Sequence, residues 1–220
     1  LTRARYSTLT GRRVVLRSEV ETEVDEVIPG FGATYLLNDD VTLFASVHRG
    51  FNPPGPASGS ASEKSVNGEF GLRYGRDALG AFGQGGAIAV PASLAYTYTR
   101  AEFRDSFSSS FEEWGDVESG DRLPYLPEHL VHGEIGVVGE RWRVNLAANY
   151  IDEMRSVAGS GAIPAGEGTD AVVVWDLSAA LRVHDQVEFY ARLENLTDEA
   201  YVVARRPAGA RPGQPRSAFA

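Results

Sequence analysis

Apolar residues recur at every second position along most of the chain, and this alternation constrains its fold more than any other feature. The clearest runs cover residues 41–48, 66–74, 141–150, 173–183 and 187–194. In the run 173–183 every odd-numbered residue is apolar, whereas the even-numbered ones include Asp176, Ser178 and Arg182. Because successive side chains of a β-strand point to opposite faces, the pattern predicts strands with one apolar and one polar face. The predicted fold class is therefore all-β, built as an antiparallel sheet.

The length of the runs and their aromatic ends separate a membrane sheet from a soluble one, which alternation alone does not do. The predicted strands run to about 9 to 12 residues, near the length that crosses a bilayer at a tilt, whereas soluble strands more often have about 5 or 6 residues. Aromatic residues such as Tyr35, Tyr74, Trp142 and Tyr150 fall toward the strand ends. This placement is typical of the aromatic girdles of outer-membrane barrels. Length and girdle together favour an antiparallel transmembrane β-barrel.

The connections between the predicted strands alternate between short and long. Residues 37–40, 139–140 and 184–186 form tight turns, whereas 49–64, 104–127 and 155–170 are long and rich in Gly, Ser and Pro. Short turns at one end of a sheet and long loops at the other are the arrangement of outer-membrane barrels. Following the chain through these connections gives roughly eight complete strands with ragged ends.

The composition excludes several classes of protein. No segment approaches the roughly 18 to 20 consecutive apolar residues of a transmembrane helix. Lysine and arginine total 21 against 30 aspartates and glutamates, and this net charge of −9 argues against general nucleic-acid binding. The chain has no cysteine, which excludes disulfide scaffolds and thiolate metal sites. The glycines at 83–86 do not complete a dinucleotide-binding motif, because position 88 is Ile88, and no P-loop or GxSxG elbow occurs. We therefore expect no enzyme.

Several segments resemble the C-terminal part of TonB-dependent outer-membrane receptors, and in particular their ferric-citrate (ferric dicitrate) receptor-like branch. In chain order they are 27–35 (VIPGFGATY), 43–54 (LFASVHRGFNPP), 63–65 (EKS), 125–129 (YLPEH), 150–155 (YIDEMR), 194–201 (ENLTDEAY) and 205–213 (RRPAGARPG). Each segment is short, and their order along nearly the whole chain carries the resemblance.

The resemblance implies a 22-stranded barrel with an N-terminal plug in the outer membrane of a Gram-negative bacterium. Such a receptor imports a ferric chelate, here ferric citrate or another iron–siderophore complex, with energy delivered through TonB. The chelate would be its substrate, and no cofactor is implied. Residues 1–220 would form the C-terminal portion of the barrel domain, with roughly 8 to 10 strands, surrounded by outer-membrane lipid and lipopolysaccharide.

Three departures from the family pattern bear on this expectation. The plug is absent from this chain, and contact with the TonB complex would pass through it. The final strand is truncated at Ala220. A glycine-rich stretch near 75–90 stands where the family has a further hairpin, and either a natural deletion or an excised piece of sequence would explain it.

Six arginines in the outer loops are candidate substrate-binding residues: Arg49, Arg104, Arg155, Arg205, Arg206 and Arg211. The first three follow strands directly, so they could face a shared vestibule. The others belong to segment 205–216, which holds four arginines and no acid. Guanidinium groups suit carboxylates and phosphates, so a ferric carboxylate or a lipopolysaccharide phosphate is a plausible partner. The alternative is pairing with the acidic loop at 112–121. No family site residue carries over residue by residue.

The four histidines predict no metal site. His129 and His132 are the closest pair in sequence, and a spacing of three places them on opposite faces of a strand. His48 falls in the polar row that would face the barrel lumen.

Two other readings follow from the same alternation. A small self-closed membrane barrel, structural or adhesive, would pair residues 1–7 with the strand that begins near Pro215. A soluble β-sandwich binding module would instead bury the apolar faces of its strands against a second sheet.

Overall fold

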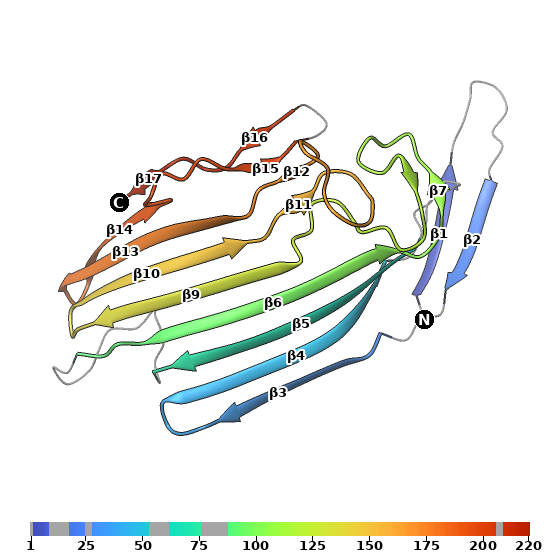
Figure 1. The fold of residues 1–220 in the computed structure, drawn as a ribbon. Helices are drawn as coiled ribbons and strands as arrows, with labels where there is room; N and C mark the ends of the chain where they lie inside the picture. The colour runs from blue at the N-terminus through green and yellow to red at the C-terminus, as the bar shows by residue number, and fades with distance from the viewer. Residues whose placement is uncertain (1, 9–17, 25–27, 53–61, 76–87, 206–208) are drawn as a thin grey trace.

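The computed structural model describes residues 2–8, 18–24, 28–52, 62–75, 88–205 and 209–220. All regular structure in these segments is β-structure, as Figure 1 shows. No helix that is long and apolar enough to cross a membrane occurs in the described part of the chain.

Eight of the ten strands that have seven or more residues form the main body. They are β3 (Gly30–Leu36), β4 (Val41–Asn52), β5 (Glu63–Tyr74), β6 (Ala92–Phe103), β9 (His129–Val138), β10 (Trp142–Ile151), β13 (Val172–His184) and β14 (Val187–Glu194). The remaining strands are β1 (Thr2–Thr8), β2 (Ser18–Val24), β7 (Phe107–Ser108), β8 (Asp116–Val117), β11 (Met154–Arg155), β12 (Gly168–Thr169), β15 (Val202–Ala204), β16 (Arg211–Pro212) and β17 (Ser217–Phe219).

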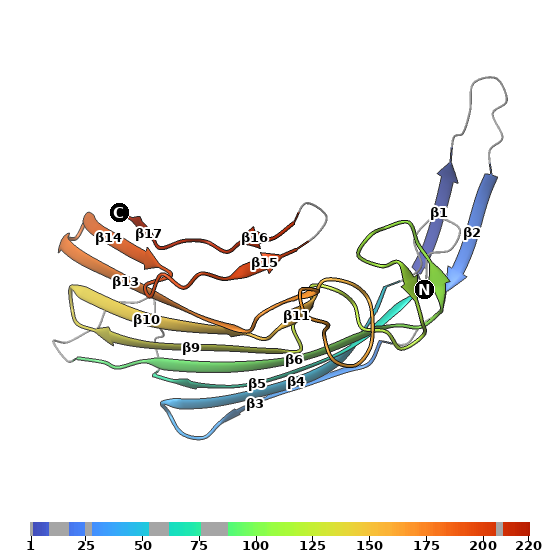
Figure 2. The ribbon, with the colours of Figure 1, turned by 45° about the horizontal axis from the view of Figure 1, so that its top comes forward.

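The eight long strands and β17 form one antiparallel sheet in the order β17-β14-β13-β10-β9-β6-β5-β4-β3. Strands β4, β5 and β6 have twelve residues each and β13 has thirteen, so the predicted membrane-crossing lengths are confirmed. Figures 1 and 2 show a curved sheet that does not close on itself. The tight turns lie at one end of it and the long loops at the other, as the sequence predicts (Figure 1).

The register aligns residues of like polarity across neighbouring strands. Ala45 of β4 lies opposite Phe70 of β5, and Phe70 lies opposite Tyr96 of β6. On the other face, Ser46 lies opposite Glu69, which in turn lies opposite Thr97. The alternation read from the sequence therefore becomes two continuous faces, one apolar and one polar.

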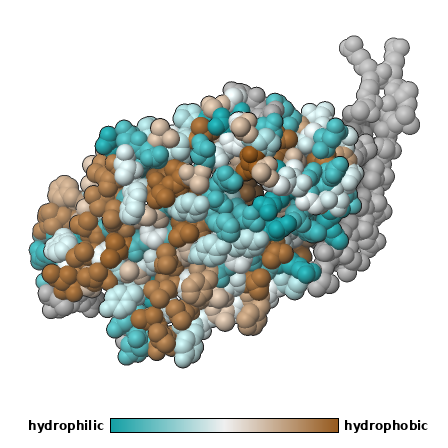
Figure 3. All heavy atoms as spheres, viewed as in Figure 1, coloured by the Kyte–Doolittle hydropathy of each residue, from teal (hydrophilic) through white to brown (hydrophobic). Residues whose placement is uncertain are grey.

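The apolar face of the sheet is exposed. Phe70, Ile135 and Leu181 have 54%, 50% and 48% of their surface accessible, so no second layer covers these side chains. Figure 3 shows apolar residues gathered over the strands toward the short-turn end and polar residues gathered toward the long-loop end. A soluble sandwich would bury such residues between two sheets. The sheet is a single layer, which argues against the sandwich reading.

The pairing of the terminal strands contradicts the self-closed barrel. Residues Thr2–Thr8 pair with Ser18–Val24, and β17 pairs with β14 at the edge of the large sheet. The predicted pairing of residues 1–7 with the strand near Pro215 is therefore wrong. Strand β1 forms a two-stranded hairpin with β2 instead.

Strands β5 and β6 are direct neighbours, paired from Glu63 opposite Phe103 to Tyr74 opposite Ala92. The glycine-rich connection between them stands where the resemblance implies a further hairpin. Its residues 76–87 lie outside the described part of the chain. The nine-stranded sheet, called the wall below, is continuous between β5 and β6.

Candidate functional site

Most of the deeply buried residues lie at or beside the long-loop end of the sheet. Phe103, Ser156 and Asn195 have only 1% of their surface accessible there. Phe103 and Phe107 pack edge-on against Trp114, with ring centroids 5.6 and 5.7 Å away, and Phe111 does the same at 5.4 Å. These rings give the loop after β6 a small core of its own. The loop end is thus a folded surface on which functional side chains have fixed positions.

The segment after this aromatic core runs back along the edge of β6. Phe103 donates its backbone N–H to the carbonyl of Asp121 at 2.9 Å, and Leu123 donates to the carbonyl of Ala101 at 3.2 Å. Arg122 forms an isolated bridge with Glu102 on one side and with Gly159 on the other. The loop therefore extends the sheet, and Arg122 points to the same face as Glu102.

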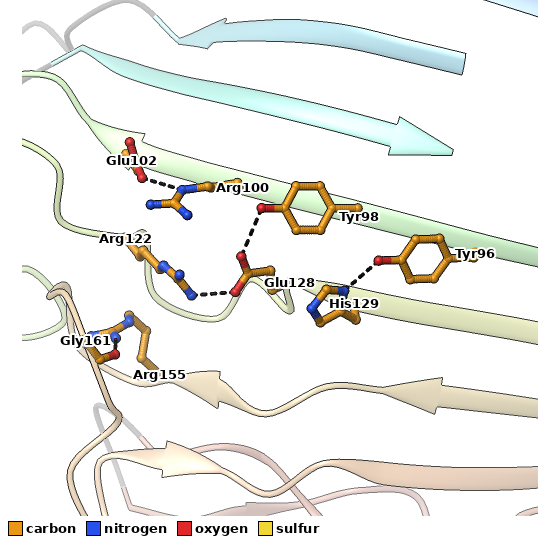
Figure 4. A network of polar contacts seen from close by, with 9 residues as sticks. All are labelled: Tyr96, Tyr98, Arg100, Glu102, Arg122, Glu128, His129, Arg155 and Gly161. Carbon is orange, nitrogen blue, oxygen red and sulfur yellow. Dashed lines mark hydrogen bonds and ion pairs between the residues drawn. The ribbon is translucent and has the colours of Figure 1, made fainter. Parts of the chain in front are cut away.

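A chain of polar contacts follows from this placement (Figure 4). Arg122 donates to Oε2 of Glu128 at 2.5 Å, and the hydroxyl of Tyr98 donates to Oε1 of the same carboxylate at 3.1 Å. Nε of Arg100 donates to Glu102 at 2.6 Å. The hydroxyl of Tyr96 lies 2.8 Å from Nδ1 of His129. These contacts tie β6 to the start of β9.

Arg155 is the predicted site residue that the structure buries most deeply, with 7% of its surface accessible. Its guanidinium donates to the carbonyl of Gly161 at 2.9 Å (Figure 4). Burial lowers the pKa of Arg155, and the nearby positive charge of Arg122 lowers it further, against a smaller opposing effect of Asp121. Both arginines line a cavity of about 80 Å³. The cavity is also lined by Arg100 and by the carboxylates of Glu128, Asp152 and Glu153, so it gathers cationic and anionic groups together.

Arg49 and Arg104 lie elsewhere, together with Lys64 and Arg100, around a hollow of about 420 Å³. The guanidinium carbon of Arg104 lies 5.7 Å from the ring centroid of Phe51. β4 continues without interruption to Asn52, so Arg49 shares the face of its apolar residues rather than the polar face. Arg49 and Arg104 therefore line a different hollow from Arg155, and the three do not share one vestibule. Substrate contact by these residues stays a prediction.

The described arginines of segment 205–216 separate in the structure. The backbone N–H of Arg205 lies 3.4 Å from the hydroxyl of Tyr125, and its side chain donates to the carbonyl of Gly168. Arg211 is exposed in β16, and Arg206 lies outside the described residues. Arg216 pairs with Asp198 at 3.2 Å rather than with the acidic loop at 112–121.

The polar face of the sheet contains the charged side chains that the sequence predicts to face the barrel lumen. Arg143 pairs with Glu188 at 3.0 Å, and Arg192 approaches Glu194 at 3.0 Å and Asp176 at 4.0 Å. A hollow of about 420 Å³ lies over this face between β9 and β14. The expectation that these charged residues share one face is confirmed by the register.

His129 and His132 lie on opposite faces, as predicted. His129 lies opposite Tyr98 on the apolar face, whereas Nδ1 of His132 lies 2.7 Å from Oδ1 of Asn149 on the polar face. In the part of the chain that the structure describes, no three His, Asp or Glu side chains gather as ligands of a metal ion.

Sequence reasoning gave no role to Arg122, Glu128 or Asn195. Glu128 belongs to the segment 125–129, one of those that resemble TonB-dependent receptors. Asn195 donates to the carbonyls of Glu199 and Gln214, both at 2.9 Å, and accepts from the N–H of Glu199 at 2.8 Å. Its backbone φ of 51° is a conformation that asparagine tolerates better than most residues. An asparagine directly after a predicted strand is the signal that could have identified it.

Comparisons with known proteins agree with this geometry. Residues 3–87 match the family model described as TonB dependent receptor-like, beta-barrel. A comparison with curated proteins found no match.

Two solved structures are similar over nearly the whole chain. The siderophore receptor PiuA from Acinetobacter baumannii has a TM-score of 0.59 and 17% identity, covering 92% of this chain and 28% of that one. The closed form of the ferric-catecholate import receptor Fiu from E. coli K12 has a TM-score of 0.50 and 18% identity, covering 99% and 39%. The fold is thus that of part of a TonB-dependent receptor β-barrel, and the sheet in this chain is not closed. The chain spans well under half the length of either structure.

Proposed function

We propose that this chain is part of the wall and outer loops of a TonB-dependent receptor that imports a ferric chelate across a Gram-negative outer membrane. The observation that carries the proposal is the single-layer antiparallel sheet whose apolar face is exposed and whose opposite face is lined with charge. Lipid would cover the apolar face, and the polar face would line the lumen.

The assembly of the complete receptor belongs to the same proposal. The open edges β3 and β17 would pair with further strands, because unpaired backbone groups are costly in a bilayer. Residues 1–220 would form the C-terminal portion of the barrel domain. A plug inside the barrel would receive energy from TonB, and the ferric chelate would pass along the polar face.

The site proposed for the chelate is the loop-end cavity of Arg122 and Arg155. Its guanidinium groups would exchange their present partners, Glu128 and the carbonyl of Gly161, for the carboxylates of a negatively charged chelate such as ferric citrate. Arg205 approaches the same loops through Tyr125, and we propose Arg206 and Arg211 of the same sequence segment as further contacts of the chelate. Arg49 and Arg104 line a separate hollow together with Arg100, and they remain candidates for contact with the chelate.

Uptake of ⁵⁵Fe supplied as different chelates tests the proposal in cells that carry or lack the gene. We expect uptake of at least one anionic chelate to require both the gene and TonB. Arg155→Lys would keep the charge and lose the planar fork, so it should lower uptake of that chelate less than Arg155→Gln does. Equal uptake with and without the gene, for every chelate tried, would refute the import function.

A further inference from the structure

The small cavity at the loop end is lined by as many acidic as basic side chains. The basic ones are Arg100, Arg122 and Arg155, and the acidic ones are Glu128, Asp152 and Glu153. In their ionised forms these three cations and three carboxylates sum to no net charge. Charge complementarity therefore favours a ligand group that carries both signs over one that is only negative.

Part of this charge is already compensated by ion pairs. Arg122 donates to Glu128 at 2.5 Å, and Arg100 donates to Glu102 at 2.6 Å (Figure 4). Among the residues that the structure describes, the charges that remain for a ligand are Arg155 on the basic side and Asp152 and Glu153 on the acidic side.

Arg155 and Asp152 both have neutral hydrogen-bond partners. Arg155 has 7% of its surface accessible and donates to the carbonyl of Gly161 at 2.9 Å. Oδ1 of Asp152 accepts from the hydroxyl of Tyr150 at 2.9 Å. A buried charge is costly when its partners are neutral, so the carboxylate of a ligand would stabilise Arg155.

The backbone places these opposite charges close together. Asp152 and Glu153 directly follow β10, which ends at Ile151, and Arg155 lies in β11 two residues later. All three side chains line the same cavity. One short segment therefore presents a cation and two anions to one ligand group.

The size of the cavity limits what can enter it. Its volume is about 80 Å³, whereas sites that hold a whole small molecule have roughly 300–1,000 Å³. A water molecule takes about 30 Å³, so the space corresponds to roughly two or three waters. Only a head group of a few heavy atoms fits, and the iron-binding part of a chelate would stay outside.

We propose that this cavity binds an amino-acid head group of the chelate, in which one carbon carries an ammonium and a carboxylate. Arg155 would hold the carboxylate through its planar fork, and Asp152 and Glu153 would hold the ammonium. The substrate class is then a ferric chelate with a peripheral α-amino acid, a group that citrate lacks. The inference rests on the proposed function and narrows its substrate.

Matched chelates, tested on the complete receptor in outer-membrane vesicles, measure the contribution of each charge. All carry ⁵⁵Fe on the same citrate-type iron-binding part. One bears the intact amino-acid head group, one bears its N-acetyl form without the ammonium, and one bears the corresponding amine without the carboxylate. We expect the intact probe to bind about tenfold more tightly than either derivative, as a single charge-assisted hydrogen bond provides.

Two variants separate the two halves of the head group. Asp152→Asn combined with Glu153→Gln should lower the affinity for the intact probe to that for the N-acetyl form. Arg155→Gln should instead remove the advantage of the intact probe over the amine. Glu140→Gln is the matched control, because Glu140 is an exposed acid in the tight turn between β9 and β10, and it should behave as the wild type does. Heat-modifiable migration on a gel checks that each variant is folded.

Equal affinity of the wild type for the intact and N-acetyl probes would overturn the inference, and so would a preference that survives in the Asp152→Asn, Glu153→Gln variant. Uptake into cells separates this result from the proposed function. Import of the probes without any head-group preference in binding would refute the head-group site alone. Head-group-dependent binding without TonB-dependent uptake would refute the import function and leave the site standing.

Discussion

The wall of the molecule and its loop end are stabilised in different ways. In the wall, residues as large as Phe70 and Phe189 have more than half of their surface accessible, at 54% and 63%. In the loop end, Phe103 and Val117 have 1% and 3% accessible. The wall is thus held by hydrogen bonds between strands and by whatever covers its apolar face, whereas the loop end is held by its own packing. A substitution should therefore act through lipid in the wall and through cavity formation in the loops.

The largest effect should come from the core of the loop end. Phe103→Ala removes the ring that packs against Phe107 and Trp114, and a buried Phe→Ala change costs about 3–5 kcal/mol. We expect the loop 104–121 to become accessible to protease while the barrel keeps its heat-modifiable migration. Phe103→Leu should have a smaller effect. Loss of the barrel together with the loop would show that the two regions are not independent.

Leu146→Arg should destabilise the wall by about 2–4 kcal/mol, because Leu146 lies midway along the apolar row of β10. The matched control is Ala147→Arg on the opposite face, where the new cation would lie opposite Glu134 and Asp176. Urea unfolding of the protein in lipid vesicles gives both free energies. Equal destabilisation by the two substitutions would contradict the assignment of the faces.

Asn195→Ala should cost about 1–3 kcal/mol, since it removes the three hydrogen bonds that the buried Asn195 side chain makes with the backbone of Glu199 and Gln214. Asn195→Asp keeps the acceptor for the N–H of Glu199 and should cost less. The same urea titration compares them. If Asn195→Ala left the free energy of unfolding unchanged, packing alone would hold the connection after β14.

The smallest effect is expected on the exposed pair Arg216–Asp198, whose side chains are 55% and 53% accessible. Arg216→Gln should change the free energy of unfolding by less than about 1 kcal/mol. Raising the salt concentration should affect the wild type and this variant alike. A large, salt-sensitive loss would show that the pair is more important than its exposure suggests.

The wall could be predicted from the sequence far better than the loop end. The run 187–194 coincides with β14, and the other runs lie within or overlap their strands almost fully, because period-2 alternation is a local property. The loop end depends on contacts between distant residues, such as Arg205 with Tyr125 and Asn195 with Gln214. No local pattern encodes such contacts. The alternation predicts a strand that ends at His48 and hence a loop position for Arg49, whereas β4 continues to Asn52.

The central claim is that one face of the sheet meets lipid and the other meets a polar lumen. The chain has no cysteine, so single cysteines can be placed at 142–149 in β10 without a background thiol. Spin labels at these positions report their access to oxygen, which concentrates in lipid, and to a water-soluble nickel chelate. We predict oxygen access to peak at the even positions 142, 144, 146 and 148 and nickel access at the odd ones. Access without this alternation, or with the opposite phase, would contradict the account.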